Sequence, residues 1–175
     1  DAMRYYGRKY GLNYGVSLPT LRSIANGEEQ NHSLAQYLYK QQVRELRLAA
    51  LHIAQAEAMT LDEAPFWAEG VINSEVAEEI AFALLPRTTI LSQIFAEWSQ
   101  SDNEFLAYAA LMAAARSNIA RDTDAIHSIP AILNRFASSR IIAQGAVALL
   151  AAAYDCDSEA RKCVTEIISK LEESP

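Results

Sequence analysis

Apolar residues recur along the chain at intervals of three and four, which is the spacing of amphipathic helices. No stretch alternates apolar and polar residues as a half-buried strand does, so the pattern predicts an all-α protein. Turn-forming residues separate the expected helices. These cover residues 2–11, the segment that Ser17 caps and Gly27 ends, and then 33–41, 43–58, 61–71, 74–85, 88–99, 102–117, 124–137, 139–154 and 157–173.

Two of the helix starts carry a capping box. Thr60 with Glu63, and Ser101 with Glu104, have the spacing at which a hydroxyl side chain and a glutamate each bind the other's backbone amide. We therefore expect helices to begin directly after Thr60 and Ser101.

The expected helices also show a weak internal repeat, in which small apolar residues dominate residues 46–54, 106–114 and 146–153. The helices at 102–117 and 139–154 are apolar nearly all round, so we expect them to be the most buried. Short connections favour antiparallel neighbours. The pattern predicts one domain over residues 1–175, an α-α superhelix of HEAT-like helix pairs. Because the chain starts with Asp inside an expected helix, we also expect that some N-terminal residues are missing.

Charge is distributed unevenly. The chain has 15 Lys and Arg against 22 Asp and Glu, a net charge of −7, which is the wrong sign for coating nucleic acid non-specifically. Residues 57–104 hold ten acids against Arg87, whereas residues 1–22 hold four bases against one acid. No apolar run is long enough to span a membrane, and the two cysteines are expected to be free thiols, so we expect a cytoplasmic protein.

The N-terminal stretch alternates aromatic and basic residues, among them Arg4, Tyr6, Arg8 and Lys9. Such a mixture suits a nucleic-acid surface, on which bases stack and cations meet phosphates. The alternative is a first helix that packs its tyrosines and leaves its charges in water. We favour this alternative, because four cations are few in an acidic chain.

Three acids, Glu75, Glu78 and Glu79, cluster on one expected helix. They could form a general base or a metal site, but a solvated acidic face near a helix N-terminus is favoured by the helix dipole. Elsewhere the sequence has no Gly-rich phosphate loop, nucleophile elbow or zinc signature. We therefore expect neither a metal nor a cofactor.

Two stretches resemble one protein family. Residues 3–25, MRYYGRKYGLNYGVSLPTLRSIA, are similar to the opening of the bacterial DNA alkylation repair proteins, the HEAT-like alkylpurine DNA glycosylases and their relatives. Residues 98–110, WSQSDNEFLAYAA, resemble a second segment of that family. The resemblance implies a bacterial protein with a curved solenoid fold, whose concave face holds DNA in the active members.

The resemblance also assigns site positions. The family's catalytic Asp falls on Glu78, or on Glu79 if the register slips by one, and its phosphate-binding Arg falls on Tyr108. Its two tryptophans fall near Ser74 and on Leu149, while the early tyrosine is kept as Tyr6. Tyr108 lacks the fixed charge that Arg brings to a phosphate.

These departures lead to two hypotheses. The favoured one is a divergent relative without the excision chemistry, a binding module for another protein or for an unusual nucleic-acid structure, and not an enzyme. Its DNA contacts would be weak and would come from Arg4, Tyr6, Arg8, Lys9 and Tyr108. The alternative is an active alkylpurine DNA glycosylase that releases 3- or 7-alkylated purines with Glu78 as the catalytic carboxylate.

Overall fold

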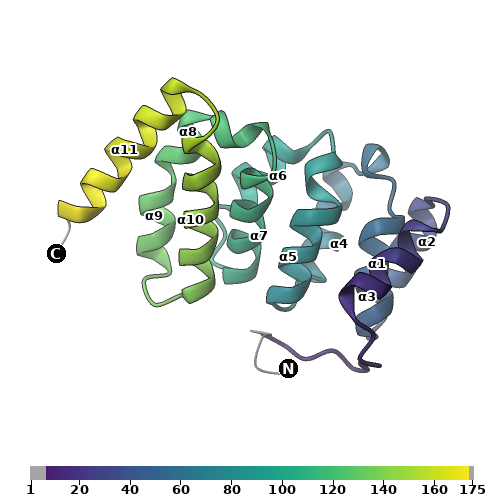
Figure 1. Ribbon diagram of the computed structural model, residues 1–175. Helices are drawn as coiled ribbons and strands as arrows, with labels where there is room; N and C mark the ends of the chain where they lie inside the picture. Colours follow the sequence, from purple (N-terminus) through teal and green to yellow (C-terminus); the bar gives the residue numbers. More distant parts are fainter. Residues whose placement is uncertain (1–6, 174–175) are drawn as a thin grey trace. The chain divides into compact units, whose positions relative to one another are not determined.

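The computed structural model describes residues 7–173, and every regular element within them is a helix (Figure 1). The α-helices are α1 (Leu18–Asn26), α2 (His32–Tyr39), α3 (Arg44–Ile53), α4 (Ala64–Glu69), α5 (Ser74–Ala83), α6 (Leu91–Trp98), α7 (Glu104–Ala115), α8 (Thr123–His127), α9 (Ile129–Arg135), α10 (Arg140–Tyr154) and α11 (Ser158–Glu173). Short 3-10 turns lie at Ala56–Ala58, Leu61–Glu63, Leu85–Arg87 and Asn118–Arg121. The all-α prediction is confirmed. No helix in this part of the chain is long and apolar enough to cross a membrane.

The chain divides into two compact units, one up to Leu91 and one from Ser92 onward. In the first unit α3 packs against α1, α2 and α5. Its core includes Trp67, whose ring centroid lies 4.7 Å from that of Tyr39. No linker marks the boundary in the sequence, and the expectation of a single domain stays a prediction.

Gly70 permits close packing in the first unit. A Cβ atom at this position would come within 2.1 Å of the Tyr39 ring, so no larger residue fits without a shift of the aromatic core. The Tyr39 hydroxyl donates a hydrogen bond of 2.7 Å to the Trp67 carbonyl oxygen, which fixes the ring in this place. The end of α4 is thereby held against the end of α2.

In the second unit α10 packs along α7 (Figure 1). Gly145 lies at their closest approach, since a Cβ there would be 3.0 Å from the Leu111 side chain and 3.2 Å from Tyr108. Cys163, with the apolar residues of α11 around it, packs toward α8 and α10.

Several expected helices differ from the observed ones. Residues 7–11 are not helical, so the expected first helix is wrong there, and its residues 1–6 lie outside the described part. The expected helix 124–137 is divided into α8 and α9 at Ser128, with Pro130 in the first turn of α9. The capping box at Thr60 and Glu63 is present.

The helix after Ser101 begins differently from the expected capping box. Asn103 is the N-cap of α7, and its side-chain oxygen accepts hydrogen bonds from the amides of Phe105 and Leu106. The Ser101 hydroxyl oxygen instead accepts a hydrogen bond from the Asn103 amide, which lies before the first turn of α7. An Asn side chain is as good a cap as Ser, and here it lies directly next to the helix.

The two helices expected to be the most buried are not. Eight of the ten residues of α5 are buried, compared with seven of twelve in α7 and six of fifteen in α10. α10 keeps one side open to solvent, where Val147 is 64 % exposed. Apolar composition alone therefore overestimated the burial of α10.

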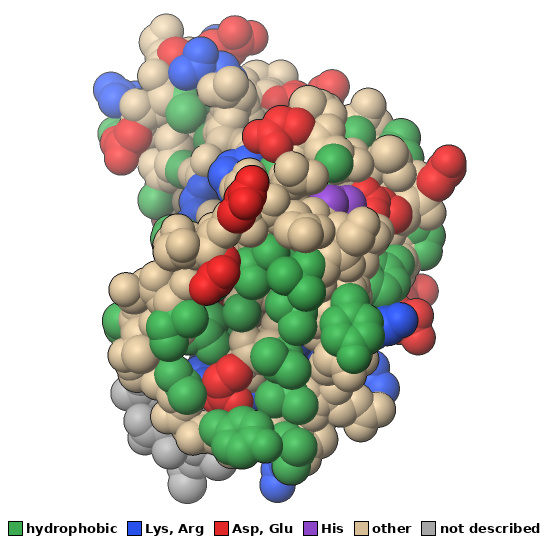
Figure 2. All heavy atoms as spheres, turned by 90° about the vertical axis from the view of Figure 1, so that its right-hand side faces the viewer, with side chains coloured by type: hydrophobic (Ala, Val, Ile, Leu, Met, Phe, Trp, Pro, Cys, Tyr) green, Lys and Arg blue, Asp and Glu red, His purple; other side chains and the backbone are tan. Residues whose placement is uncertain are grey.

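An apolar surface covers the outer side of α1 and α2 (Figure 2). Ile24 on α1 is 63 % exposed, and Tyr37 and Leu34 on α2 are 58 % and 43 % exposed. Contiguous apolar surface of this kind is characteristic of contact with another molecule.

Candidate nucleic-acid interface

The described part of the N-terminal segment, residues 7–16, runs in extended form past the starts of α5 and α3 (Figure 1). The Arg8 amide donates to the Ile72 carbonyl oxygen at 2.9 Å, and the Leu12 amide donates to that of Gln42 at 2.8 Å. Main-chain hydrogen bonds thus attach the segment to the loops that precede these two helices. Such bonds fix a backbone path without requiring a helix or a sheet.

The buried ion pair between Glu75 and Arg44 holds the middle of the segment through a hydrogen bond to Tyr10. Glu75, on the first turn of α5, is 7 % exposed and accepts hydrogen bonds from Arg44 Nε at 2.8 Å and Nη2 at 3.0 Å. Its Oε1 also accepts the Tyr10 hydroxyl at 2.7 Å. Burial, together with the hydrogen bond and charge of Glu75, raises the pKa of Tyr10 far above its usual value. The phenol therefore stays protonated and remains a donor.

Glu45 fixes the end of the segment. Its carboxylate accepts the backbone amides of Tyr14 at 3.0 Å and Val16 at 3.3 Å, and Arg44 Nη1 at 2.8 Å. Burial tends to raise the pKa of Glu45, but the hydrogen bonds from Tyr14 and Arg44 outweigh it and hold that pKa below its ordinary value. Gly15, between the two amides, has a φ of +73°, a conformation that favours glycine.

Two of the cations expected at a DNA surface lie on this fixed segment. Arg8 and Lys9 are exposed, and neither forms an ion pair with another residue in the range 7–173. Arg4 and Tyr6 lie outside the described residues. Tyr10 faces inward to Glu75, so the segment combines exposed cations with an inward-facing tyrosine.

A second buried carboxylate lies one turn further along α5. Glu79 is 1 % exposed, and Arg22 donates to it from Nε at 3.2 Å and from Nη2 at 3.0 Å. His52 Nε2 lies 3.5 Å from the same carboxylate. Burial tends to raise the pKa of Glu79, but His52 and Arg22 outweigh this and lower it below the ordinary value. Glu79 is therefore ionised at neutral pH and held as a charge partner.

The expected solvated acidic face is wrong for Glu75 and Glu79. Both are buried because arginines from earlier helices, Arg44 and Arg22, supply bidentate partners, the geometry in which buried carboxylates are tolerated. Glu78 is exposed, one position off that buried side. Of the two positions considered for the catalytic carboxylate, Glu78 is therefore the one open to solvent, and its role stays a prediction.

Tyr108 lies in the core instead of on a surface. Its side chain on α7 is 2 % exposed and faces the close approach of α10 at Gly145. This burial argues against the expected contact of Tyr108 with a DNA phosphate, which stays a prediction. Leu149 and Ser74, the positions of the family's tryptophans, are 0 % and 3 % exposed.

Other reactive groups in the described residues do not form a site of their own. No group of three or more His, Cys, Asp or Glu in residues 7–173 could hold a metal ion. Cys163 Sγ lies 3.5 Å from His127 Nε2, but burial and the nearby Glu166 charge raise the pKa of the thiol. A thiol with a raised pKa is a poor nucleophile.

The arginines that organise the first unit were not singled out as site residues from the sequence. Arg22 lies on α1 and Arg44 and Arg47 lie three positions apart on α3, and no recognised sequence motif marks them. Only Arg22 could be noticed, through its place in the resemblance to a family segment. Most of their hydrogen-bond partners are distant in sequence, such as Glu79 for Arg22 and Glu75 for Arg44.

Comparison with known proteins gives two matches. The family model for DNA alkylation repair enzymes matches residues 1–169. A solved structure, described as a new family of proteins related to the HEAT-like repeat DNA glycosylases with affinity for branched DNA structures, matches with a TM-score of 0.75. The two chains are 18 % identical, and the match covers 91 % of this chain and 71 % of the other. The HEAT-like fold prediction is thereby confirmed. No similar protein was found among curated proteins.

Proposed function

Because the chain belongs to the DNA alkylation repair enzyme family, we propose that it is a member that binds branched DNA and does not excise bases. The observation that carries the proposal is the fixed N-terminal segment, which presents Arg8 and Lys9 without ion-pair partners in the described part of the chain. The affinity for branched DNA that describes the similar structure supports the choice of substrate. Cations on a fixed backbone lose less entropy on meeting phosphates than cations on a mobile tail.

The low number of cations sets the strength of the binding. If Arg8, Lys9 and Arg4 each neutralise one phosphate, the logarithm of the binding constant falls with a slope of about −2.7 against the logarithm of salt concentration. Raising salt from about 50 to about 200 mM then weakens binding roughly 40-fold. The net charge of −7 acts in the same direction, so affinity for plain duplex should be weak.

We expect no base excision because most of the positions that the resemblance assigns lie in the core or in an ion pair. Glu79 is already bound to Arg22 and closed to solvent, and Tyr108 and Leu149 belong to the core. Excision of a cationic base needs a carboxylate and fixed positive charge together near the sugar. Residues that act as a set lose activity together when most of the set is changed.

The test compares a four-way junction with a duplex of the same sequence by fluorescence anisotropy, at low and at physiological salt. We expect tighter binding to the junction, and a loss of about 10-fold when Arg8 and Lys9 are both changed to Ala, which removes two phosphate contacts. The matched control changes Arg121 and Lys162, two exposed cations of the second unit, to Ala and should bind as the unmodified protein does. Nanomolar duplex affinity at physiological salt, unaffected by Arg8→Ala and Lys9→Ala, contradicts the proposal.

The exposure of Glu78 favours a second candidate function. Glu78 is an exposed residue of α5, and its carboxylate could stabilise positive charge on a sugar, which is the role of the catalytic acid in an alkylpurine DNA glycosylase. Release of 3- or 7-alkylated purines from DNA, lost in Glu78→Gln, would establish this candidate in place of the first.

A further inference from the structure

A basic pocket lies beside the N-terminal segment. Its volume is about 330 Å³, and it is bounded by the segment, the ends of α2 and α4, and the start of α3. Four of its lining residues are cations, namely Arg8, Lys9, Lys40 and Arg47, against one acid, Glu69. The pocket is therefore positive although the chain is acidic.

Arg47 is the buried member of this group. It is 7 % exposed, and its Nη1 and Nη2 donate to the carbonyl oxygens of Gly70 at 3.1 Å and Gln41 at 3.2 Å. Its Nε has no hydrogen-bond partner, and no carboxylate pairs with it in residues 7–173. An arginine is always charged, so this leaves a buried charge without a counter-charge and a donor without an acceptor.

The neighbouring buried and half-buried arginines show how different this is. Arg44 has Glu75 as a bidentate partner, and Arg22 has Glu79 in the same way. In both pairs the protein itself provides the anion. For Arg47 the protein provides only backbone carbonyls, which satisfy donors but do not neutralise a charge.

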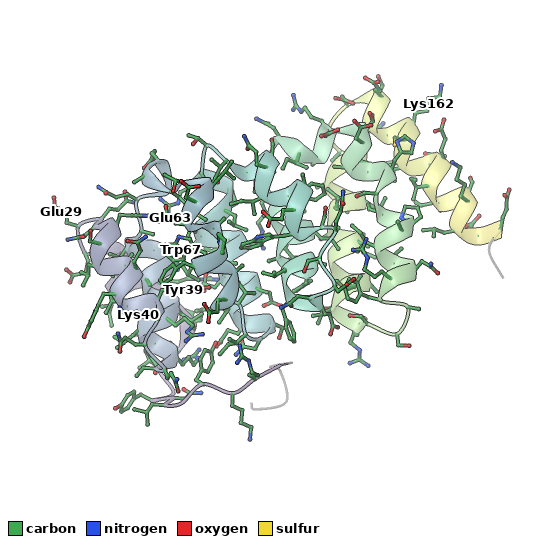
Figure 3. All side chains as sticks on the ribbon, turned by 180° about the vertical axis from the view of Figure 1, so that it is seen from behind. Glu29, Tyr39, Lys40, Glu63, Trp67 and Lys162 are labelled. Carbon is green, nitrogen blue, oxygen red and sulfur yellow. The ribbon has the colours of Figure 1, made fainter. Side chains whose placement is uncertain are left out.

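The walls of the pocket are flat and aromatic next to Arg47. Tyr39 lies under the guanidinium, which is 5.7 Å from its ring centroid, and Phe66 and Tyr10 also line the space. The Tyr39 hydroxyl already binds the Trp67 carbonyl, so Tyr39 offers its ring alone. Figure 3 shows Tyr39 beside Trp67, with Lys40 following it at the end of α2.

We propose that this pocket binds the phosphate group of a nucleotide, with Arg47 as the buried cation and with Arg8, Lys9 and Lys40 at the rim. Arg is the side chain best suited to a phosphate, because its planar group presents parallel donors. The volume is near the lower end of about 300–1,000 Å³ for ligand pockets, which suits one nucleotide and excludes a duplex. The inference rests on the proposed function only for the source of the phosphate, a DNA strand.

The first measurement follows the side-chain Nε–H signals of arginine by ¹⁵N NMR while inorganic phosphate is added at constant ionic strength. We expect one signal to shift, and we expect that signal to be missing in Arg47→Lys. An identical shift on adding sodium chloride would mean that only charge screening is seen, and would overturn the proposal. So would a phosphate titration that leaves the Arg47 signal in place.

The second measurement uses a mononucleotide, 5′-deoxyadenylate, against the same nucleoside without phosphate. The nucleotide should bind at least about 10-fold more tightly, and Arg47→Lys should remove about 10-fold of its affinity. Arg47 is buried, so folding of that variant is checked by its melting curve. Lys40→Ala changes an exposed residue and should lower the affinity for the nucleotide about 3-fold, whereas Lys162→Ala in the second unit should leave that affinity unchanged. Equal affinity for nucleotide and nucleoside, unaffected by Lys40→Ala, contradicts the proposal.

Branched DNA as the third probe separates this inference from the proposed function. If the junction binds and shifts the Arg47 signal, both stand. If the junction binds while phosphate, nucleotide and DNA all leave that signal unmoved, the pocket proposal fails and the proposed function stands. If phosphate and nucleotide bind but no DNA does, the pocket is a site for free nucleotide and the proposed function fails.

Discussion

The ion pair beneath the N-terminal segment should decide how firmly the segment is held. In Glu75→Gln the carboxylate becomes a neutral amide of nearly the same shape, so the buried Arg44 loses its counter-charge and one of the two acceptor oxygens that bind its nitrogens. Breaking a buried pair by removing one partner costs about 3–5 kcal/mol of the free energy of unfolding. Arg44 retains Glu45 Oε2 at 2.8 Å and the Val16 carbonyl at 2.7 Å, so we expect the lower end, about 3 kcal/mol.

A loss of this size is easily measured in a chain of this length. At about 2–4 °C per kcal/mol, the melting temperature of Glu75→Gln should fall by roughly 6–12 °C. The matched control is Glu78→Gln, which makes the same chemical change three positions along the same helix on an exposed side chain. Surface changes of this kind usually stay within about 0.5 kcal/mol.

The same variant should also loosen the segment. Tyr10 and Arg44 must then share the one acceptor oxygen that the Gln amide retains, so amide hydrogen exchange at Leu12 and Tyr14 should become faster in Glu75→Gln than in Glu78→Gln. Binding of the DNA junction should also weaken, because Arg8 and Lys9 would lie on a less ordered segment and would lose more conformational entropy on binding. Equal melting temperatures and equal exchange in the two variants would refute the reasoning, because they would mean that the ion pair neither stabilises the unit nor holds the segment.

Three further predictions follow from the described contacts. The pKa of Glu79 is lower in the folded protein than the ordinary 4.5, so the stabilising effect of the ionised carboxylate is complete above pH 4.5 and is lost as pH falls through the folded pKa. The free energy of unfolding, measured by urea melts, should therefore fall less between pH 7 and pH 3 in Glu79→Gln than in the unmodified protein. An equal fall in the two proteins would argue against the Arg22 pair. Gly70→Ala should destabilise the first unit by about 1–3 kcal/mol because its Cβ would overlap the Tyr39 ring, whereas Gly27→Ala, with its nearest contact at 3.4 Å, should cost less in the same thermal melts. DNA that carries 7-methylguanine should show no base release above background in a chromatographic assay, and clear release that Glu78→Gln abolishes would make the chain an active glycosylase.

The helical framework could be predicted because its determinants are local. Asn73 caps α5 by accepting the Val76 amide, and Ser17 caps α1, each within three residues of its partner. The N-terminal segment could not be predicted in this way. Tyr6 and Tyr10 have helical spacing, but the described part of the segment is held by Ile72, Asn73 and Glu75, which lie more than 60 positions along the chain.

The candidate site was harder to predict for the same reason. The acids of α5 are visible in the sequence, but whether each one is solvated or buried depends on arginines 31 and 57 positions earlier. Val76 and Ile80 were a signal that was available, since they share the buried side of α5 with Glu75 and Glu79. Tyr108 was placed correctly on a helix, but its burial depends on Gly145 in the facing helix.

The net charge of the chain is a poor guide to the charge that DNA would meet at the N-terminal segment. Glu75 and Glu79 belong to the acidic stretch, yet each is neutralised inside the first unit by an arginine from outside that stretch. Arg8, Lys9, Lys40 and Arg47 line one pocket, and none of them forms an ion pair within residues 7–173. At physiological salt, charges separated by more than about 8 Å are largely screened, so exposed acids further away count for little there. An acidic protein can therefore offer one small basic site, and such a site suits a single strand or a strand end better than a long duplex.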